Sequence, residues 1–132
     1  MTIGMSTALR NARLDAITTA AGANAKLRLY TATRPATGGT VTTLLAECTC
    51  GSTFAAAASG GVLTLNAITS DSAADASGTA TWGRLVKSDN TFVMDMSVGA
   101  IGSGADLEMN SNVISAGAAV SITGATLTEA NA

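Results

Sequence analysis

Hydrophobic and polar residues alternate with a period of two along much of the chain, the pattern of β-strands with one buried face. In KLRLYTA, Leu27, Leu29 and Thr31 alternate with Arg28 and Tyr30. Similar patterns predict further strands at 62–68, 78–87, 91–99, 106–109, 112–115 and 119–128. TTLLAECTC, at 42–50, is compatible with a strand or with a helical turn. The stretches TRPATGG and TSDSAADASG lack this periodicity and are predicted to be loops.

One segment near the N-terminus has the period of a helix instead. Ser6 or Thr7 can cap a helix over about residues 7–21, and Gly22 is its natural end. Alanine dominates its apolar face and buries little area, so we expect this helix to dock on the domain or on another subunit rather than to found the core. The expected apolar face consists of Leu9, Ala12, Ala16, Ile17 and Ala20.

Together these elements predict a mainly β fold, an antiparallel β-sandwich or barrel with one N-terminal α-helix. The chain has 132 residues, which is enough for one domain. We assign residues 1–25 to a helix and linker arm and residues 26–132 to a single β-rich domain.

The strongest hairpin signal is the pair of strands that flank SDN, residues 88–90. If Asp89 and Asn90 are the two turn residues, counting outward places Arg84 opposite Asp95, as a cross-strand ion pair on the polar face. A three-residue turn would shift that pairing. The second strand is expected to place four large side chains on one apolar face: Phe92, Met94, Met96 and Val98.

Composition favours a protein that lies against other protein. Charged residues make up 12% of the chain against about 25% in typical proteins, and much of the 47% hydrophobic fraction is alanine. A surface of serine, threonine, asparagine and glycine offers little charge to resist contact, so we expect a homo-oligomer or larger assembly.

The charge pattern argues against binding to nucleic acid, because the net charge is −2 and the basic residues are scattered. Arg10 and Arg13 lie one helical turn apart, but two solvated or interface-paired arginines explain them better than a phosphate site.

Few residues can support catalysis. The chain has no histidine, which excludes histidine triads, histidine general bases and histidine metal sites. GAIGSG, at 99–104, has neither the order of a nucleotide-binding loop nor a following lysine. Asp71 and Asp75 offer carboxylates, but their spacing does not match a calcium loop. We therefore predict no enzymatic activity, no cofactor and no metal site.

The two cysteines, Cys48 and Cys50, lie two residues apart in ECTCG. In a strand this spacing points both side chains to the same face, which is poor geometry for a mutual disulfide. With no histidine to complete a zinc site, we predict buried free thiols.

The N-terminal sequence MTIGMSTALRNARL lacks the basic start and the apolar run of roughly 7–15 residues of a secretory signal. No stretch reaches the roughly 18 uninterrupted apolar residues of a membrane helix. We expect a soluble product of the cytoplasm, without contact with a membrane.

Five stretches carry a resemblance: STALRNARLDAIT, LRLYTATRPATGG, GGVLTLNAITSDSAADASGTATW, NTFVMDMSVG and VSITGATLTEANA. Over nearly the whole chain, this pattern resembles a family of small proteins encoded among the virion structural genes of tailed bacteriophages and prophages. The resemblance contains no catalytic signature. It implies a component of the virion.

Among virion positions we expect the capsid surface, because small β-rich proteins with few charges commonly decorate or cement expanded heads. The expected partners are the major capsid protein and copies of the chain itself. The alternative is a neck or tail adaptor or completion protein that forms a ring. Candidate partner contacts on the helix are Leu9, Arg10, Arg13 and Ile17, and those on the loops are Arg34, Pro35, Asp71 and Asp75.

A third hypothesis, from a different class, is a glycan-binding module that stacks sugars on Trp82 and Tyr30. Such sites usually need several exposed aromatic rings, and this chain has few. The sequence leaves open whether Trp82 is a core or an interface residue, since its strand neighbours are polar while its size favours burial.

Overall fold

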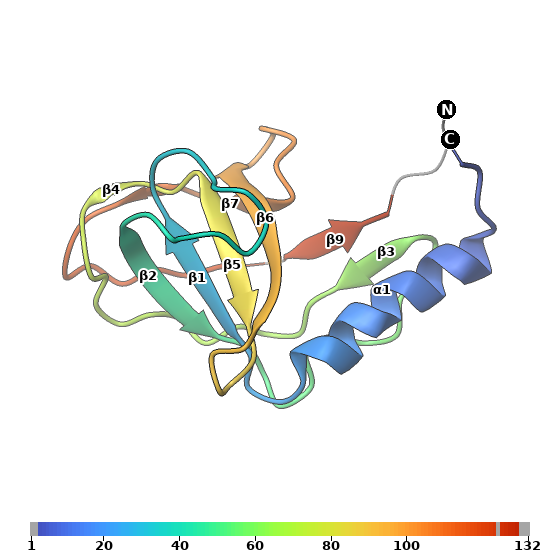
Figure 1. The fold of residues 1–132 in the computed structure, drawn as a ribbon. Coiled ribbons are helices and arrows are strands. Elements are labelled where there is room, and N and C mark those ends of the chain that lie inside the picture. The colour runs from blue at the N-terminus through green and yellow to red at the C-terminus, as the bar shows by residue number, and fades with distance from the viewer. Residues whose placement is uncertain (1–2, 124, 130–132) are drawn as a thin grey trace.

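The computed structural model describes residues 3–123 and 125–129 and confirms a mainly β fold with one N-terminal helix and 35% strand. Its centre is a curled, half-barrel sheet of five strands in the order β2-β1-β5-β6-β7, with the two-stranded ribbon β3-β9 beside it (Figure 1). A second two-stranded ribbon joins β4 and β8. The helix is α1 (Thr7–Ala21). The strands are β1 (Lys26–Tyr30), β2 (Leu44–Thr49), β3 (Val62–Thr64), β4 (Gly78–Thr79), β5 (Trp82–Val86), β6 (Phe92–Ala100), β7 (Leu107–Met109), β8 (Val113–Ile114) and β9 (Thr126–Thr128).

The predicted antiparallel pairing holds for every described strand pair except the last one in the large sheet, where β6 and β7 run parallel. Parallel neighbours usually need a crossover of a dozen or more residues. Here the short connection between Ala100 and Leu107 doubles back on itself. Gly102 and Gly104 make this possible with φ of 89° and 79°, which side chains other than glycine rarely adopt.

The β5-β6 hairpin has the predicted Arg84–Asp95 register but a different turn. The Lys87 N–H donates to the Thr91 carbonyl, and Asn90 has a φ of 71°, so residues 88–90 form a three-residue turn. An irregularity between Leu85 and Val86 compensates for the extra turn residue. The prediction of a two-residue turn is therefore wrong, although the pairing it gave is correct.

The same irregularity overturns the predicted position of Phe92. Val86 pairs with Phe92 and Leu85 with Met94, so Val93 is an extra residue on β6, as in a β-bulge. The bulge moves Phe92 to the face that carries Arg84, where its side chain is 39% exposed rather than part of the apolar face. The side chains of Met96 and Val98 are buried as predicted.

The hydrophobic core lies on one face of the large sheet. Leu27 and Leu29 of β1 and Leu85 of β5 are almost completely buried there. The β3-β9 ribbon covers them with Leu63 and Leu127. Aliphatic side chains thus supply most of this core, as expected for a chain with few aromatic residues.

Helix α1 has the predicted bounds. The Leu9 N–H donates to the Ser6 hydroxyl at its start, and Gly22, with a φ of 68°, ends it. The helix lies along β3 (Figure 1). Its side chains bind the chain before that strand, because Asp15 accepts from the Ala58 N–H at 2.8 Å and Asn11 from the Gly61 N–H at 2.9 Å.

The predicted apolar face of α1 is only partly correct. The residues it buries against the core are Leu14 and Ala21, with Ile17 partly buried, a spacing of three and then four residues. Leu14 sets this face because it buries more area than alanine does. Four of the predicted residues are exposed instead: Leu9, Ala12, Ala16 and Ala20.

Three predicted strands are shorter than expected because the chain changes partners along them. In the stretch 62–68, β3 ends at Thr64, and Leu65 makes an isolated bridge with Ala55. In the stretch 78–87, the Ala80 N–H donates to the Asn112 carbonyl and the Thr81 N–H to Tyr30, so β4 and β5 belong to different sheets. In the stretch 119–128, Val120 makes an isolated bridge with Asp71, and of the residues described there only Thr126–Thr128 form a strand. No helix in the described residues is long and apolar enough to cross a membrane.

The hydrogen bond from Ala58 to Asp15 predicts how α1 is held. Asp15→Ala is expected to lower the free energy of unfolding by about 1–3 kcal/mol, because a partly buried N–H loses its acceptor. Thr19→Ala is the control, since Thr19 is exposed on the same helix and its hydroxyl bonds within it. Urea unfolding of both variants measures the difference. Equal losses in the two would contradict this account.

Candidate functional site

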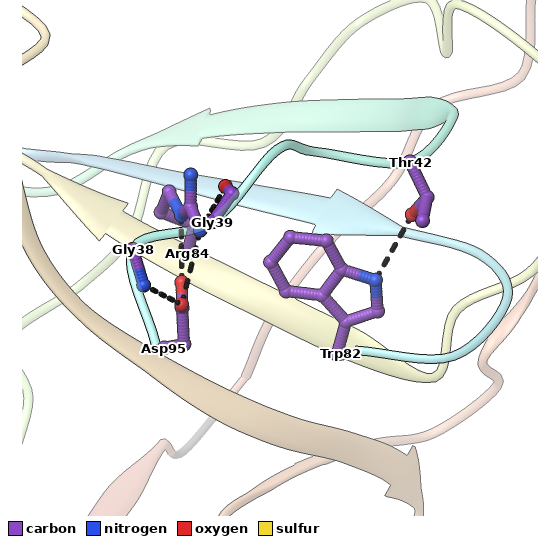
Figure 2. Close-up of polar contacts among 6 residues, drawn as sticks. All are labelled: Gly38, Gly39, Thr42, Trp82, Arg84 and Asp95. Atoms are coloured by element: carbon purple, nitrogen blue, oxygen red, sulfur yellow. Dashed lines mark hydrogen bonds and ion pairs between the residues drawn. The ribbon is translucent and has the colours of Figure 1, made fainter. Parts of the chain in front are cut away.

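Residues 31–43, here called the strap, lie over the face of the large sheet opposite the core. The Gly38 N–H donates to Asp95 Oδ2 at 3.0 Å, and Arg84 Nη2 donates to the Gly39 carbonyl at 3.0 Å (Figure 2). Further along, the indole N–H of Trp82 donates to the Thr42 hydroxyl at 3.0 Å. The strap is therefore attached to the sheet at two places.

The tight turn predicted in the strap forms at its two glycines. The Gly39 N–H donates to the Ala36 carbonyl at 2.7 Å, and Gly38 has a φ of 73°, as in a type II turn. At Gly39 there is no room for a side chain, because a Cβ would lie 2.8 Å from the Ala36 carbonyl oxygen. The turn thereby brings the Gly38 N–H and the Gly39 carbonyl to the same ion pair.

That ion pair is the predicted one between Arg84 and Asp95. It is bidentate, with Arg84 Nε 2.6 Å from Oδ1 and Nη2 3.0 Å from Oδ2. The two side chains are only 10% and 3% exposed, and the guanidinium also lies 5.4 Å from the Trp82 ring centre and 5.0 Å from that of Phe92. This is an arginine almost completely enclosed by its own chain.

Electrostatics keep both partners of this pair charged. Burial raises the pKa of Asp95, but hydrogen bonds from Arg84 and Gly38 and the positive charge of Arg84 outweigh it, so the pKa lies below its ordinary value of 3.8. The hydrogen bond to Asp95 raises the pKa of Arg84 despite burial. The pair therefore stays ionised at neutral pH and serves to hold the strap.

The two aromatic residues considered as sugar platforms are buried under the strap. Tyr30 and Trp82 stack with ring centres 4.3 Å apart and are 3% and 1% exposed. Burial also raises the pKa of Tyr30. Trp82 is thus a core residue of this face, and neither ring offers an open surface for stacking a sugar.

A second ion pair lies on the same face, nearer the hairpin turn. Arg28 Nε lies 2.6 Å from Glu47 Oε2, and Arg28 Nη2 donates to the Asn90 side chain at 2.6 Å. Lys26 Nζ donates to the same amide oxygen at 3.2 Å. These contacts tie the hairpin turn to β1 and β2.

The arginines predicted on the helix reach the end of β9. Arg10 Nη1 donates to the Glu129 carbonyl at 3.2 Å, and Arg13 Nη1 lies 2.8 Å from the Glu129 carboxylate. Of the apolar candidates on the helix, Leu9 is 49% exposed and Ile17 packs partly against the core. Leu9 is therefore the candidate on this helix that presents apolar surface to solvent.

The candidate contact residues on the loops also differ in exposure and in their contacts within the chain. Arg34 is exposed on the strap and Pro35 is partly buried there, with Pro35 packed near Gly39. Asp71 has a structural role, because its carboxylate accepts from the Glu47 N–H at 2.9 Å and from the Ala73 N–H at 3.0 Å. Asp75 is exposed, while its N–H donates to Leu45 in β2.

The acidic stretch 69–75 thus has a local function that the sequence did not reveal. Thr69 bridges Thr49, and the contacts of Asp71 and Asp75 continue along the outer edge of β2. An open strand edge invites pairing with another chain, and this segment covers it.

The cysteines are free and buried, as predicted. Burial raises the pKa of Cys48, and burial together with the nearby Cys48 raises the pKa of Cys50 to about 11. Thiolates are scarce at such pKa values, so these groups are packing residues rather than nucleophiles.

A groove between β7 and β9 was not predicted. It has a volume of about 580 Å³, and Asp106 and Glu108 lie on its wall. A smaller hollow of about 300 Å³ adjoins it beside Leu14, Ile17 and Met94 of α1 and β6. One sequence signal could have indicated this acidic site, since no lysine or arginine follows Lys87.

Within residues 3–123 and 125–129, no three aspartate, glutamate or cysteine side chains gather in a group suited to a metal ion. The described ion pairs join segments of this chain to one another. Comparisons of the chain with models of protein families, with curated proteins and with solved structures find no match.

The Arg84–Asp95 pair predicts a specific loss of stability. Asp95→Asn is expected to cost about 3 kcal/mol, because it leaves a nearly buried guanidinium without its counter-charge. Since the pKa of Asp95 is lowered by folding, its contribution is fully present above pH 3.8 and is lost as the pH falls through the lower folded value. Chemical denaturation of both proteins between neutral and acidic pH measures this.

The exposed Asp75 supplies the control for that series. Asp75→Asn should follow the wild-type pH profile closely, whereas the gap between wild type and Asp95→Asn should narrow in acid. A gap that stays constant with pH would show that the carboxylate charge does not hold the strap.

The burial of the thiols predicts that they react slowly with thiol reagents. At pH 8 only about one Cys50 in a thousand is a thiolate, so Ellman's reagent should react with the folded protein only as fast as it opens. Adding denaturant should release two thiols promptly. Complete reaction of the folded protein within seconds would contradict this placement.

Proposed function

We propose that this chain is a non-enzymatic structural protein of a tailed-bacteriophage virion that binds the head surface as a decoration or cement protein. It stabilises contacts between major capsid proteins, and it acts through protein surface alone, without a cofactor. The proposal rests on the resemblance noted in the sequence and on what the described side chains do.

One observation carries the proposal: the ion pairs and the stacked aromatic rings of the described residues hold this chain's own segments together. Arg84 and Asp95 fix the strap, Arg28 fixes the hairpin turn, and Arg13 fixes the end of β9. The two buried thiols are protonated at neutral pH. What remains for a partner is the outer surface.

That surface suits contact with protein. Serine, threonine, alanine and glycine dominate it, with few charges to repel a partner. Exposed large apolar side chains are scattered over it: Ile3, Leu9, Val41, Phe92, Ile101 and Val113. Each would add apolar area to an interface at its own place on the molecule.

Many weak contacts would account for the stabilising effect. A copy that touches two or more capsid subunits adds modest area at each, and a standard interface buries only about 800 Å² per partner. These contacts act together, because a copy that is bound to one capsid subunit is held close to the neighbouring subunit, at a high effective concentration. The effect is repeated over the whole shell. The shell then resists the internal pressure of packaged DNA.

The alternative within the same class is a neck or tail adaptor or completion protein that forms a ring. A ring needs tight self-association around one axis, whereas decoration needs a surface that matches the head lattice. Copy number separates the two roles.

Quantitative mass spectrometry of purified virions, with the major capsid protein as the internal standard, tests the proposal. A decoration protein is expected at a sizeable fraction of one copy per capsid subunit. About six or twelve copies per particle, as in a ring, would assign the chain to the neck or tail. Absence from washed virions would contradict a structural role.

A second measurement tests the stabilising effect itself. Heads that lack this protein should bind the purified chain to saturation in a sedimentation assay, and should then release their DNA at a higher temperature. Saturable binding without any thermal shift would contradict a cementing role.

A further inference from the structure

The half-barrel is open between β7 and β9. β7 is the last strand of the large sheet, and β9 pairs only with β3 among the described strands. The groove of about 580 Å³ fills the space between them, and its wall includes Ile101, Asp106, Glu108, Thr126 and Thr128. This is a place where a second protein chain can fit.

Backbone groups on β9 face this opening. The Leu65 N–H donates to the Ala125 carbonyl, and the Glu129 N–H donates to the Gly61 carbonyl. Backbone groups along β9 therefore point alternately towards β3 and away from it. Thr126 and Thr128 therefore point their N–H and carbonyl groups away from β3 and towards the groove. No backbone hydrogen bond among the described residues uses these groups, so this edge can pair with another chain.

The groove also carries two carboxylates, Asp106 and Glu108. Arg13 lines the adjoining hollow together with Asp106, but its guanidinium is paired with Glu129. Asp106 accepts from the Ser97 N–H at 2.9 Å, and Glu108 accepts from the N–H groups of Gly102 and Gly104 at 3.2 and 2.9 Å. These neutral donors orient the carboxylates and leave both charges in place. No ion pair among the described residues involves either one.

The opposite end of the same sheet carries the complementary features. Lys87 is exposed at the hairpin turn, Lys26 lies beside it on β1, and Phe92 is 39% exposed. Asp89 is also there, with its carboxylate turned back to accept from the Thr91 N–H. Along β6 this end lies about 23 Å from the residue that faces Glu108. We call Lys26, Lys87 and Phe92 the tip pole, and Ile101, Asp106 and Glu108 the groove pole.

We propose that the tip pole of one copy docks into the groove pole of the next. Lys87 and Lys26 meet Asp106 and Glu108, while Phe92 covers Ile101, which is 65% exposed. Apolar contact supplies the affinity, and the charges set the direction. Because the two surfaces differ, the contact is head to tail and builds rings or open filaments rather than a twofold dimer. This contact does not depend on the virion role proposed above.

Sedimentation velocity of the purified full-length chain over a range of concentrations tests this contact. The wild type should assemble progressively, and high salt should weaken the assembly because it screens exposed pairs. Glu108→Gln should weaken association about twofold to fivefold, the contribution of one exposed ion pair, and Lys87→Glu should weaken it more, because it replaces attraction with repulsion. Thr19→Lys, which changes the net charge by one unit at an exposed position outside both poles, is the matched control and should assemble as the wild type does.

Mixing the two variants gives the sharpest outcome. The tip of Glu108→Gln can dock into the intact groove of Lys87→Glu, but the other junction fails, so only one-to-one pairs should form. A wild type that remains monomeric, or a mixture that does not associate, would overturn the proposal. If monomeric wild type binds heads and Glu108→Gln does not, the groove belongs to a capsid partner, which overturns self-docking and leaves the decoration role standing.

Discussion

The ion pair between Arg84 and Asp95 is the interaction on which one whole face of this molecule depends. The guanidinium has little access to water, so its charge needs a counter-charge and hydrogen-bond acceptors from the protein. Asp95 supplies the first and the Gly39 carbonyl adds another acceptor, while two aromatic rings lie close to the guanidinium. The strap closes over this charge and, in doing so, buries the Tyr30–Trp82 stack.

This arrangement explains how a chain with few aromatic residues covers both faces of its central sheet. Aliphatic side chains cover one face, and the strap, held by hydrogen bonds to Asp95 and Trp82, covers the other. Arg84, Asp95 and Trp82 are thereby committed to holding the strap. The remaining surface, poor in charge, is what the proposed role on a virion uses.

The sequence predicted features governed by local patterns and missed those governed by long-range pairing. Ser6 and Gly22 bounded the helix correctly because capping acts within one turn. The predicted pairing of Arg84 with Asp95 was correct although the predicted turn was one residue too short, because the bulge at Val93 offsets the longer turn. Nothing in the local pattern showed this bulge, and it moved Phe92 from the expected apolar face onto the guanidinium of Arg84.

The candidate contact residues illustrate the same limit. Asp71 looked like part of a free acidic loop, yet it accepts from the Glu47 N–H of β2, a partner 24 positions away. The strap gave a clearer signal, because Pro35 and the glycine pair marked a turn, but its attachment to Trp82 through Thr42 depends on tertiary geometry. The groove between β7 and β9 arises from a parallel pairing that alternation alone does not predict.

Hydrogen exchange measured by NMR at the Gly38 amide and at the indole N–H of Trp82 tests most directly whether the strap is part of the folded unit. Both protons are hydrogen bonded beneath or within the strap. If the ion pair anchors this face, both should exchange only by global unfolding, as slowly as the amides of β5. Exchange of both within minutes, while β5 stays protected, would show that the strap opens independently and that the Arg84–Asp95 ion pair does not hold it.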